Sequence, residues 1–148
     1  MPSGGSSGPS PDPDCIFCAI VAGEAAAEII DSDEHTVTMM DINPATRGHA
    51  LVIPRTHSPD LLAIGEDDLC RTAVAAQRIA KRMEATLEPD GFNLINSCRA
   101  AAWQTVFHFH VHVIPRYEDD PLKLPWIPRG AELNEIELIA ATIKSGGE

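Results

Sequence analysis

The sequence of 148 residues is poor in basic side chains and in long apolar runs, and each shortage argues against a class of protein. Eleven Lys and Arg face 22 Asp and Glu, and the resulting formal net charge of −11 argues against nucleic acid or an anionic membrane as a partner. No segment approaches the roughly 18 consecutive apolar residues of a membrane span. The composition that remains, 44% hydrophobic and 22% charged, is typical of one globular domain.

Cysteine is scarce as well. Four cysteines, at positions 15, 18, 70 and 98, are too few and too unevenly spaced for the disulfide framework of a small secreted domain. No secretory signal pattern and no Asn-x-Ser/Thr glycosylation acceptor is visible, which favours a reduced, cytoplasmic location. After Met1, residues 1–13 contain only Ser, Gly, Pro and Asp, so we expect a flexible tail followed by a single domain over 14–148.

The hydrophobic periodicity predicts an α+β fold. A short helix at 15–22 is stopped by Gly23, a long helix covers 66–87, and a final helix near 131–144 carries an apolar stripe. Strand patterns occur at 28–30, 36–41, 49–54, 92–96 and 105–116. Because the strands cluster and do not alternate regularly with helices, we expect an antiparallel sheet.

The most informative segment is a run in which every second residue is histidine, at 108, 110 and 112. Side chains alternate along a strand, so the three rings are expected on one face, opposite a core face of Phe107, Phe109, Val111 and Val113. Packing alone does not favour three titratable rings, and two functions stay open, a metal site or catalysis by imidazole. One strand cannot easily bring three ring nitrogens to ~2.0–2.1 Å from one zinc ion, so at least one ring is expected to serve chemistry or substrate binding.

This pattern resembles the signature of the histidine triad superfamily of nucleotide hydrolases and transferases. The similarity extends from Cys15 to about Trp126, with motifs in the family's order at Cys15–Cys18, Met40–Pro44, Arg47–Pro54, Gln104–Phe107 and His108–Ile114. The chain is most similar to bacterial members of the nucleoside phosphoramidase (Hint-like) branch. The resemblance implies a mostly antiparallel five-stranded sheet with one long and one C-terminal helix, and a homodimer.

The resemblance also implies a reaction, which is hydrolysis at the α-phosphate of purine nucleoside phosphoramidates or related nucleotide conjugates. Within the catalytic row that begins at His108, His110 would be the nucleophile that forms a nucleotidyl-histidine, and His112 would assist proton transfer to the leaving group. Two alternatives stay open. The protein could be a dinucleoside polyphosphate hydrolase or phosphorylase that uses the same histidines, or a nucleotide-binding regulatory protein with incidental hydrolysis.

Four positions take nucleotide-binding roles from the same resemblance. Asp41 would accept hydrogen bonds from the ribose hydroxyls and Ile42 would pack on the base, although an Asp before Asn-Pro is also an ordinary turn residue. Gln104 and Thr105 would lie at the phosphate side, where donors offset charge that develops on the phosphoryl oxygens.

The sequence departs from the family's pattern twice in the loop before the triad. Trp103 stands where the family usually has Gly directly before Gln104. Ser97 occupies the position of the family's phosphate-loop Asn, and Asn96 stands one residue earlier. Either Asn96 or Ser97 would then contact the phosphate.

Cys15 and Cys18 form a Cys-x-x-Cys pair with three readings: a redox pair, two ordinary buried thiols, or half of a tetrahedral zinc site. The resemblance implies the zinc site, with His49 and His108 as the other two ligands. Such a closed site would be structural and would not take part in phosphoryl chemistry. No functional role is assigned to His35, His57, Cys70 and Cys98.

Overall fold

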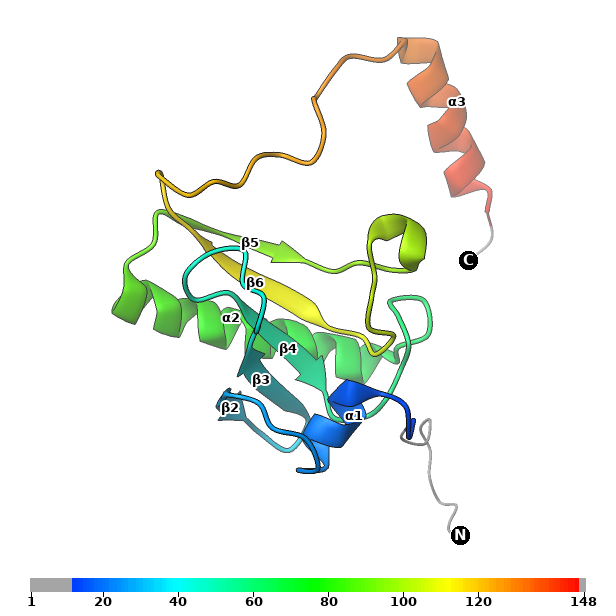
Figure 1. Ribbon diagram of the computed structural model, residues 1–148. Coiled ribbons are helices and arrows are strands. Elements are labelled where there is room, and N and C mark those ends of the chain that lie inside the picture. The colour runs from blue at the N-terminus through cyan, green and yellow to red at the C-terminus, as the bar shows by residue number, and fades with distance from the viewer. Residues whose placement is uncertain (1–11, 147–148) are drawn as a thin grey trace, which may run out of the picture.

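The computed structural model describes residues 12–146, which fold into an antiparallel five-stranded sheet with helices on both sides (Figure 1). In chain order the elements are α1 (Ile16–Val21), β2 (Ile29–Ser32), β3 (Thr36–Met40), β4 (Ala50–Pro54), α2 (Glu66–Leu87), β5 (Gly91–Ile95), η1 (Ala100–Ala102), β6 (Val111–Arg116) and α3 (Leu133–Lys144). The predicted fold class is confirmed. Most of the predicted flexible tail, residues 1–11, lies outside the described residues, whereas the carbonyl of Asp12 already accepts the Cys15 N–H in the turn that enters α1.

The strands lie in the order β2-β3-β4-β6-β5, so β4 is central and β2 and β5 form the two edges. Every neighbouring pair is antiparallel. The register places Leu51 of β4 between Met39 of β3 and His112 of β6. The third histidine of the triad is therefore anchored beside the central strand.

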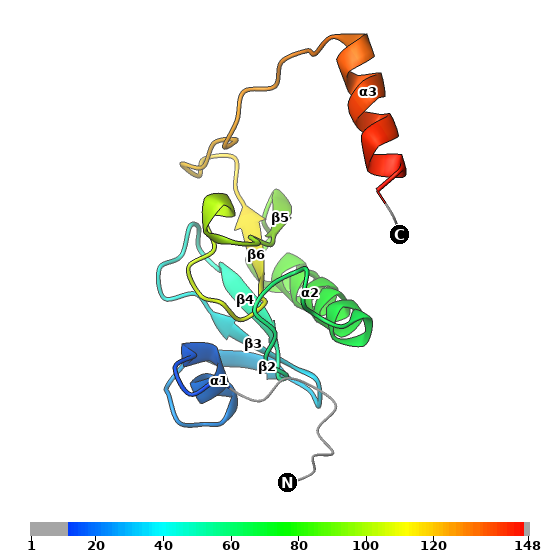
Figure 2. The same ribbon diagram turned by 90° about the vertical axis from the view of Figure 1, so that its right-hand side faces the viewer.

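Each face of the sheet is covered by one helix. On one face, α2 packs against β4 and β6, where the apolar side chains include Ala50, Val52 and Val113. The alternate residues of β4, Leu51 and Ile53, face the other way and pack with α1. Figure 2 shows α1 and α2 on opposite sides of the sheet. The triad is thus built on the side of α1.

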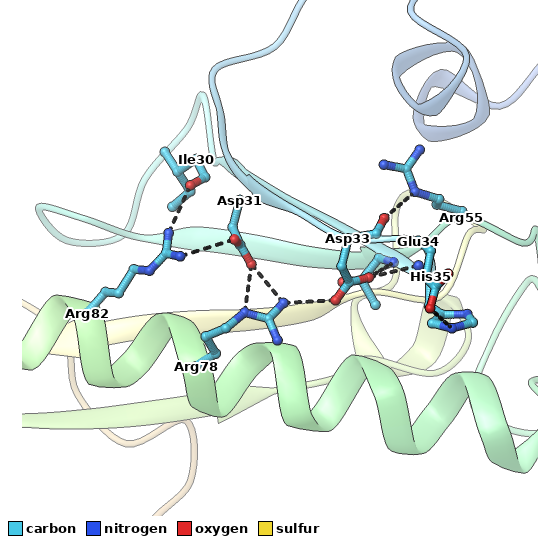
Figure 3. Close-up of polar contacts among 9 residues, drawn as sticks. Ile30, Asp31, Asp33, Glu34, His35, Arg55, Arg78 and Arg82 are labelled. Atoms are coloured by element: carbon cyan, nitrogen blue, oxygen red, sulfur yellow. Dashed lines mark hydrogen bonds and ion pairs between the residues drawn. The ribbon is translucent and has the colours of Figure 1, made fainter.

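The long helix matches its predicted range of 66–87, and charged side chains tie it to the edge strand β2 (Figure 3). Arg78 donates two hydrogen bonds to one carboxylate oxygen of Asp31, at 2.9 and 2.8 Å, and a third to Asp33 at 3.0 Å. Arg82 lies 3.3 Å from the other Asp31 oxygen. Burial acts to raise the pKa of Asp33, but hydrogen bonds from the backbone N–H groups of His35 and Thr36 lower it to about 2. These contacts pair the basic side chains of α2 with Asp31 of β2 and with Asp33 directly after it.

The structure corrects the strand predicted for 105–116. Strand β6 begins only at Val111, so the first two histidines of the triad lie in the irregular segment before it. Phe109 is buried as predicted, whereas Phe107 is 51% exposed and does not belong to the core. A backbone hydrogen bond from Phe109 N to Ser58 O, 2.7 Å long, shows why the segment leaves the sheet: it pairs with the loop after β4 and not with a strand.

The C-terminal helix forms where its periodicity predicts it, but it packs on nothing in the rest of the described chain. Helix α3 stands away from the sheet in both views (Figures 1 and 2). Its large apolar side chains are all exposed, namely Leu133, Ile136, Leu138, Ile139 and Ile143. Within residues 12–146, no helix combines the length and the apolar character that crossing a bilayer requires.

Candidate active site and metal centre

Two rings of the triad lie against α1, and the third lies beside the second. His108 and His110 are buried, and Phe17 of α1 packs edge-on against both, with ring centroids 5.9 and 5.2 Å away. The rings of His110 and His112 follow at a centroid distance of 5.1 Å. Although only the last histidine lies in β6, the three rings form the contiguous row that the alternating pattern predicts.

A backbone hydrogen bond determines which nitrogen of His110 is free. Its Nδ1 lies 2.7 Å from the carbonyl oxygen of His108, and since a carbonyl only accepts, Nδ1 carries the proton. In the neutral ring, Nε2 then bears the lone pair. Burial lowers the pKa of His110, so the ring is neutral at physiological pH. Asn96 fixes the same residue from its other side by donating to its carbonyl at 2.9 Å.

A second group of side chains, the carboxylate–histidine cluster of Asp41, His49 and His112, lies next to His110. The N–H of Ala45 donates to His49 Nδ1 at 2.9 Å, so neutral His49 carries its proton on Nε2. That Nε2 lies 2.9 Å from Nδ1 of His112 and 3.4 Å from an oxygen of Asp41. His49 therefore donates to His112, whose own proton is placed on Nε2.

His110 and His112 are thus in opposite tautomers, with the proton of His110 on Nδ1 and that of His112 on Nε2. His110 presents an unprotonated Nε2, and His112 presents an Nε2–H donor. Burial, with the neighbouring His110 and His49 rings, lowers the pKa of His112 to about 4, which keeps this arrangement uncharged. A lone pair and a proton donor side by side are what nucleophilic attack followed by protonation of a leaving group requires.

The spacing of the carboxylate–histidine cluster would also suit a metal ion, since its donor atoms lie within 4.8 Å of one another. The hydrogen bonds argue against this use. Nδ1 of His49 already accepts a backbone N–H, so a metal on Nε2 would leave the ring without any proton, as an imidazolate. The cluster is better suited to relay a hydrogen bond than to hold a cation.

The residues that do fit a metal form the cysteine–histidine cluster of Cys15, Cys18, His57 and His108. His108 donates from Nε2 to the Pro54 carbonyl at 2.8 Å, which leaves the lone pair of Nδ1 pointing into the cluster. That Nδ1 lies 3.4 and 3.6 Å from the two sulfurs and 3.2 Å from Nδ1 of His57. Ligands at ~2.0–2.3 Å from a tetrahedral zinc ion are separated by about 3.3–3.8 Å, so the cluster has the dimensions of a zinc site.

The predicted ligand set is corrected at one position. The structure places His49 in the carboxylate–histidine cluster and brings His57 to the cysteines instead. The two histidines flank opposite ends of β4, and α1 packs at the end nearer His57, where Pro54 also binds His108. The sequence signal for His57 was its place three residues beyond the buried end of that strand.

The residues predicted at the phosphate side differ in burial and in whether their polar groups are already hydrogen-bonded. Gln104 is buried and is fully occupied: its oxygen accepts the Arg99 N–H at 2.6 Å, and its amide donates to the carbonyls of Pro59 and Val106. Its side chain therefore holds the loop together. Thr105 is exposed, and Ser97 is half-buried beside Asn96.

The predicted nucleoside-side residues lie at the mouth of the carboxylate–histidine cluster. Ile42 is 87% exposed and free to contact a ligand. Asp41 accepts the Asn43 N–H at 2.8 Å, so the ordinary turn role is present, and its other oxygen faces His49. Gly48, at φ +95°, lets the chain turn directly before His49, and a Cβ there would lie 2.5 Å from Leu87.

Comparison with known proteins identifies the family. Residues 22–119 match the family model of the HIT domain, and the chain belongs to this family. A HIT family protein from Bacillus anthracis is 36% identical, with a TM-score of 0.84 over 92% of this chain and 99% of that one. A zinc-bound histidine triad family protein from Mycobacterium smegmatis is 39% identical, with a TM-score of 0.72 over 90% and 98% of the two chains. A histidine triad nucleotide-binding protein from Candida albicans is 26% identical, with a TM-score of 0.81 over 89% and 96%.

Proposed function

We propose that the protein hydrolyses nucleoside phosphoramidates, or related nucleotide conjugates, at the α-phosphate through a covalent nucleotidyl-histidine. The observation that carries this proposal is the pair of opposite tautomers, an unprotonated Nε2 on His110 beside an Nε2–H on His112. The HIT domain match and the nucleotide-binding name of the Candida albicans protein support a nucleotide as the substrate.

The reaction proceeds in two balanced steps. In the first, His110 Nε2 attacks the α-phosphorus and the bond to the leaving group breaks with its electron pair, while the His112 Nε2–H donates a hydrogen bond to the leaving nitrogen, which takes a proton from solvent water. In the second, water attacks the phosphorus, His110 Nε2 is released, and the proton that the water loses returns to solvent. The His108 carbonyl holds Nδ1–H throughout and stabilises the positive charge that the phosphorylated ring of His110 acquires.

Zinc fits the cysteine–histidine cluster, where Cys15, Cys18, His57 and His108 would hold it as a closed structural site. The zinc-bound Mycobacterium smegmatis protein supports this assignment. The cysteines precede the matched region 22–119, so the family match alone does not imply them. A bound ion would supply rigidity rather than chemistry, because it would hold the residue whose carbonyl orients the nucleophile.

We also propose roles for two nucleotide-binding residues, a homodimer and a location in the cell. Asp41 would accept hydrogen bonds from the ribose hydroxyls and Ile42 would contact a purine base. We also propose a homodimer, since β5 is an open sheet edge with exposed Leu94 and Ile95 and the apolar side of α3 is uncovered. The free cysteines and their suitability as metal ligands favour a cytoplasmic location.

The nucleophile is tested by His110→Ala. This variant should lose turnover of an adenosine phosphoramidate by at least about 10³-fold while it still binds AMP, because a covalent route is removed and the pocket is kept. Mass spectrometry of the quenched wild-type reaction should show a nucleotidyl adduct that the variant lacks. His35→Ala, on a half-buried histidine outside both clusters, is the matched control and should keep full activity. Turnover of His110→Ala near the wild-type rate would overturn the proposal.

A further inference from the structure

The loop between β5 and the triad holds two bulky residues in backbone conformations that glycine normally adopts. Arg99 has φ +78° and ψ 160°, a region that is almost restricted to glycine, and Trp103 has φ +77°. They flank the three-residue helix η1 on its two sides. Such strain lowers the stability of the folded chain unless the side chain contributes something in return.

Neither side chain contributes to the stability of the free protein through packing or pairing. Trp103 is 70% exposed, and Arg99 is exposed as well. Within the described residues 12–146, the Arg99 guanidinium forms no ion pair or hydrogen bond, and neither does the Trp103 indole. Backbone hydrogen bonds from Trp103 N to Ala100 O and from Gln104 N to Arg99 O hold these conformations, and both side chains stay available to a ligand.

The loop is held rigidly at the edge of the active site. At its start, Asn96 donates to the carbonyl of the nucleophile His110. At its end, Gln104 joins the loop to itself through Arg99 N and to the neighbouring segment through Pro59 O. Both bulky residues lie between these two anchors, so their backbones are fixed relative to His110.

The chemistry of the pair defines a ligand. An exposed indole offers a flat surface on which planar rings stack, and a guanidinium attracts phosphate or carboxylate oxygens. Arg99 is the only Lys or Arg between Arg82 and Arg116 in a chain with a net charge of −11, so it is the one cationic side chain of the loop that leads to the triad. In the proposed function, Asp41 and Ile42 bind the nucleoside on one side of His110. The leaving group then lies on the other side.

We propose that Arg99 and Trp103 form a specificity subsite for a planar, negatively charged leaving group. This inference rests on the proposed function and names the class of conjugate that the site prefers. Trp103 stacks on the ring of the leaving group, and Arg99 binds its anionic oxygens. A small uncharged amine as the leaving group would use neither residue.

The kinetic test compares two substrates with the same adenosine half. A diadenosine polyphosphate has an anionic adenine nucleotide as leaving group, and an adenosine N-methylphosphoramidate has a small amine. Trp103→Gly and Arg99→Gly should each lower kcat/KM for the diadenosine polyphosphate by about five- to 100-fold, the range expected from loss of one stacking contact or one charge pair. Turnover of the methylamidate should not change. Trp103→Phe should recover most of the lost kcat/KM.

The matched control is Glu88→Gly. Glu88 has φ +53° at the end of α2. This variant therefore also places glycine at a position with positive φ, but the position lies outside the loop. All three glycine variants should keep or raise the thermal midpoint, and only the two loop variants should change the substrate preference. Equal losses on both substrates, or losses in Glu88→Gly, would overturn the subsite.

A binding measurement separates this inference from the proposed reaction. In Trp126→Phe, Trp103 is the only tryptophan left of two, so its fluorescence reports on the loop. Diadenosine polyphosphate should quench this emission and AMP should not, and Arg99→Gly should weaken the quenching titration. Quenching without any His110-dependent turnover would overturn the reaction and keep the subsite. AMP binding with no response to the diadenosine compound would overturn the subsite alone, and no binding of either nucleotide would overturn both.

Discussion

The cysteine–histidine cluster and the carboxylate–histidine cluster lie at opposite ends of β4 and use histidine in opposite ways. In the first, His108 Nε2–H donates a hydrogen bond to the Pro54 carbonyl, and its Nδ1 lone pair points toward two sulfurs and a second ring. In the second, the Nδ1 of His49 accepts a backbone N–H, and its Nε2–H donates a hydrogen bond to Nδ1 of His112. The spacing of donor atoms is similar, and the donor types and the hydrogen bonds distinguish the two clusters.

This difference teaches that distance alone does not define a metal site. A ligand imidazole needs one free lone pair, and the backbone group that binds its other nitrogen decides whether it has one. A carbonyl, as at His108, prepares the ring for a metal. An amide N–H, as at His49, prepares it to donate a proton.

The largest expected effect separates the clusters by metal content. The protein should purify with about one zinc ion per chain. His57→Ala should lose this zinc and lower the thermal midpoint on the order of 10 °C, because the binding energy of a structural site is folding energy. His49→Ala should keep its zinc. Elemental analysis of the two variants checks this, and zinc loss in His49→Ala with retention in His57→Ala would reverse the assignment.

The second prediction concerns catalysis by the carboxylate–histidine cluster. His49→Ala should lower kcat by roughly 10²–10³-fold with little change in KM, because His112 loses the donor that places its proton on Nε2. His49→Gln keeps an amide donor for His112 and an acceptor for Ala45, and should recover part of kcat. Steady-state kinetics decide the matter: if Gln and Ala are equally impaired, His49 acts by filling space.

The third prediction is a pH dependence of stability in the metal-free protein. The pKa of His112 is lowered from its ordinary value of 6.5 to about 4, so between these values the unfolded chain binds more protons than the folded one. The contribution is complete above pH 6.5 and is lost as the pH falls toward 4. It amounts to about 3 kcal/mol.

Urea unfolding at a series of pH values measures this effect. His112→Asn should flatten the fall in the free energy of unfolding between pH 6.5 and 4. An unchanged slope would show that His112 does not titrate with a lowered pKa.

The smallest effect concerns Asp41, which has both a turn role and a proposed ribose role. If its carboxylate binds the ribose, Asp41→Asn should weaken ribonucleotide substrates by about tenfold for each charge-assisted bond lost. A 2′-deoxynucleotide should be a poor substrate for the parent protein and should suffer less from the substitution. Comparing kcat/KM for both sugars in both proteins isolates the interaction. Equal losses of kcat/KM on both sugars would show that Asp41 only stabilises the turn before Pro44.

Much of the fold could be predicted because its signals are local. The long helix was predicted at its observed bounds, since its apolar residues recur every three or four positions and Pro89 follows its end. The strands at 36–41 and 49–54 were found within one residue of their observed bounds. The strand predicted from 105 was too long, because the loop after β4 competes for the backbone of Phe109.

The sequence by itself determined the triad, the family and the Cys-x-x-Cys pair, since these depend on residue types at short, regular spacings. Only the tertiary structure decided which histidine joins the cysteines. His49 and His57 stand close to the two ends of one buried strand, and nothing local shows over which end α1 will pack. The tautomers of His110 and His112 were likewise beyond the sequence, because a carbonyl and an amide N–H at fixed distances determine them, and those distances exist only in the folded chain.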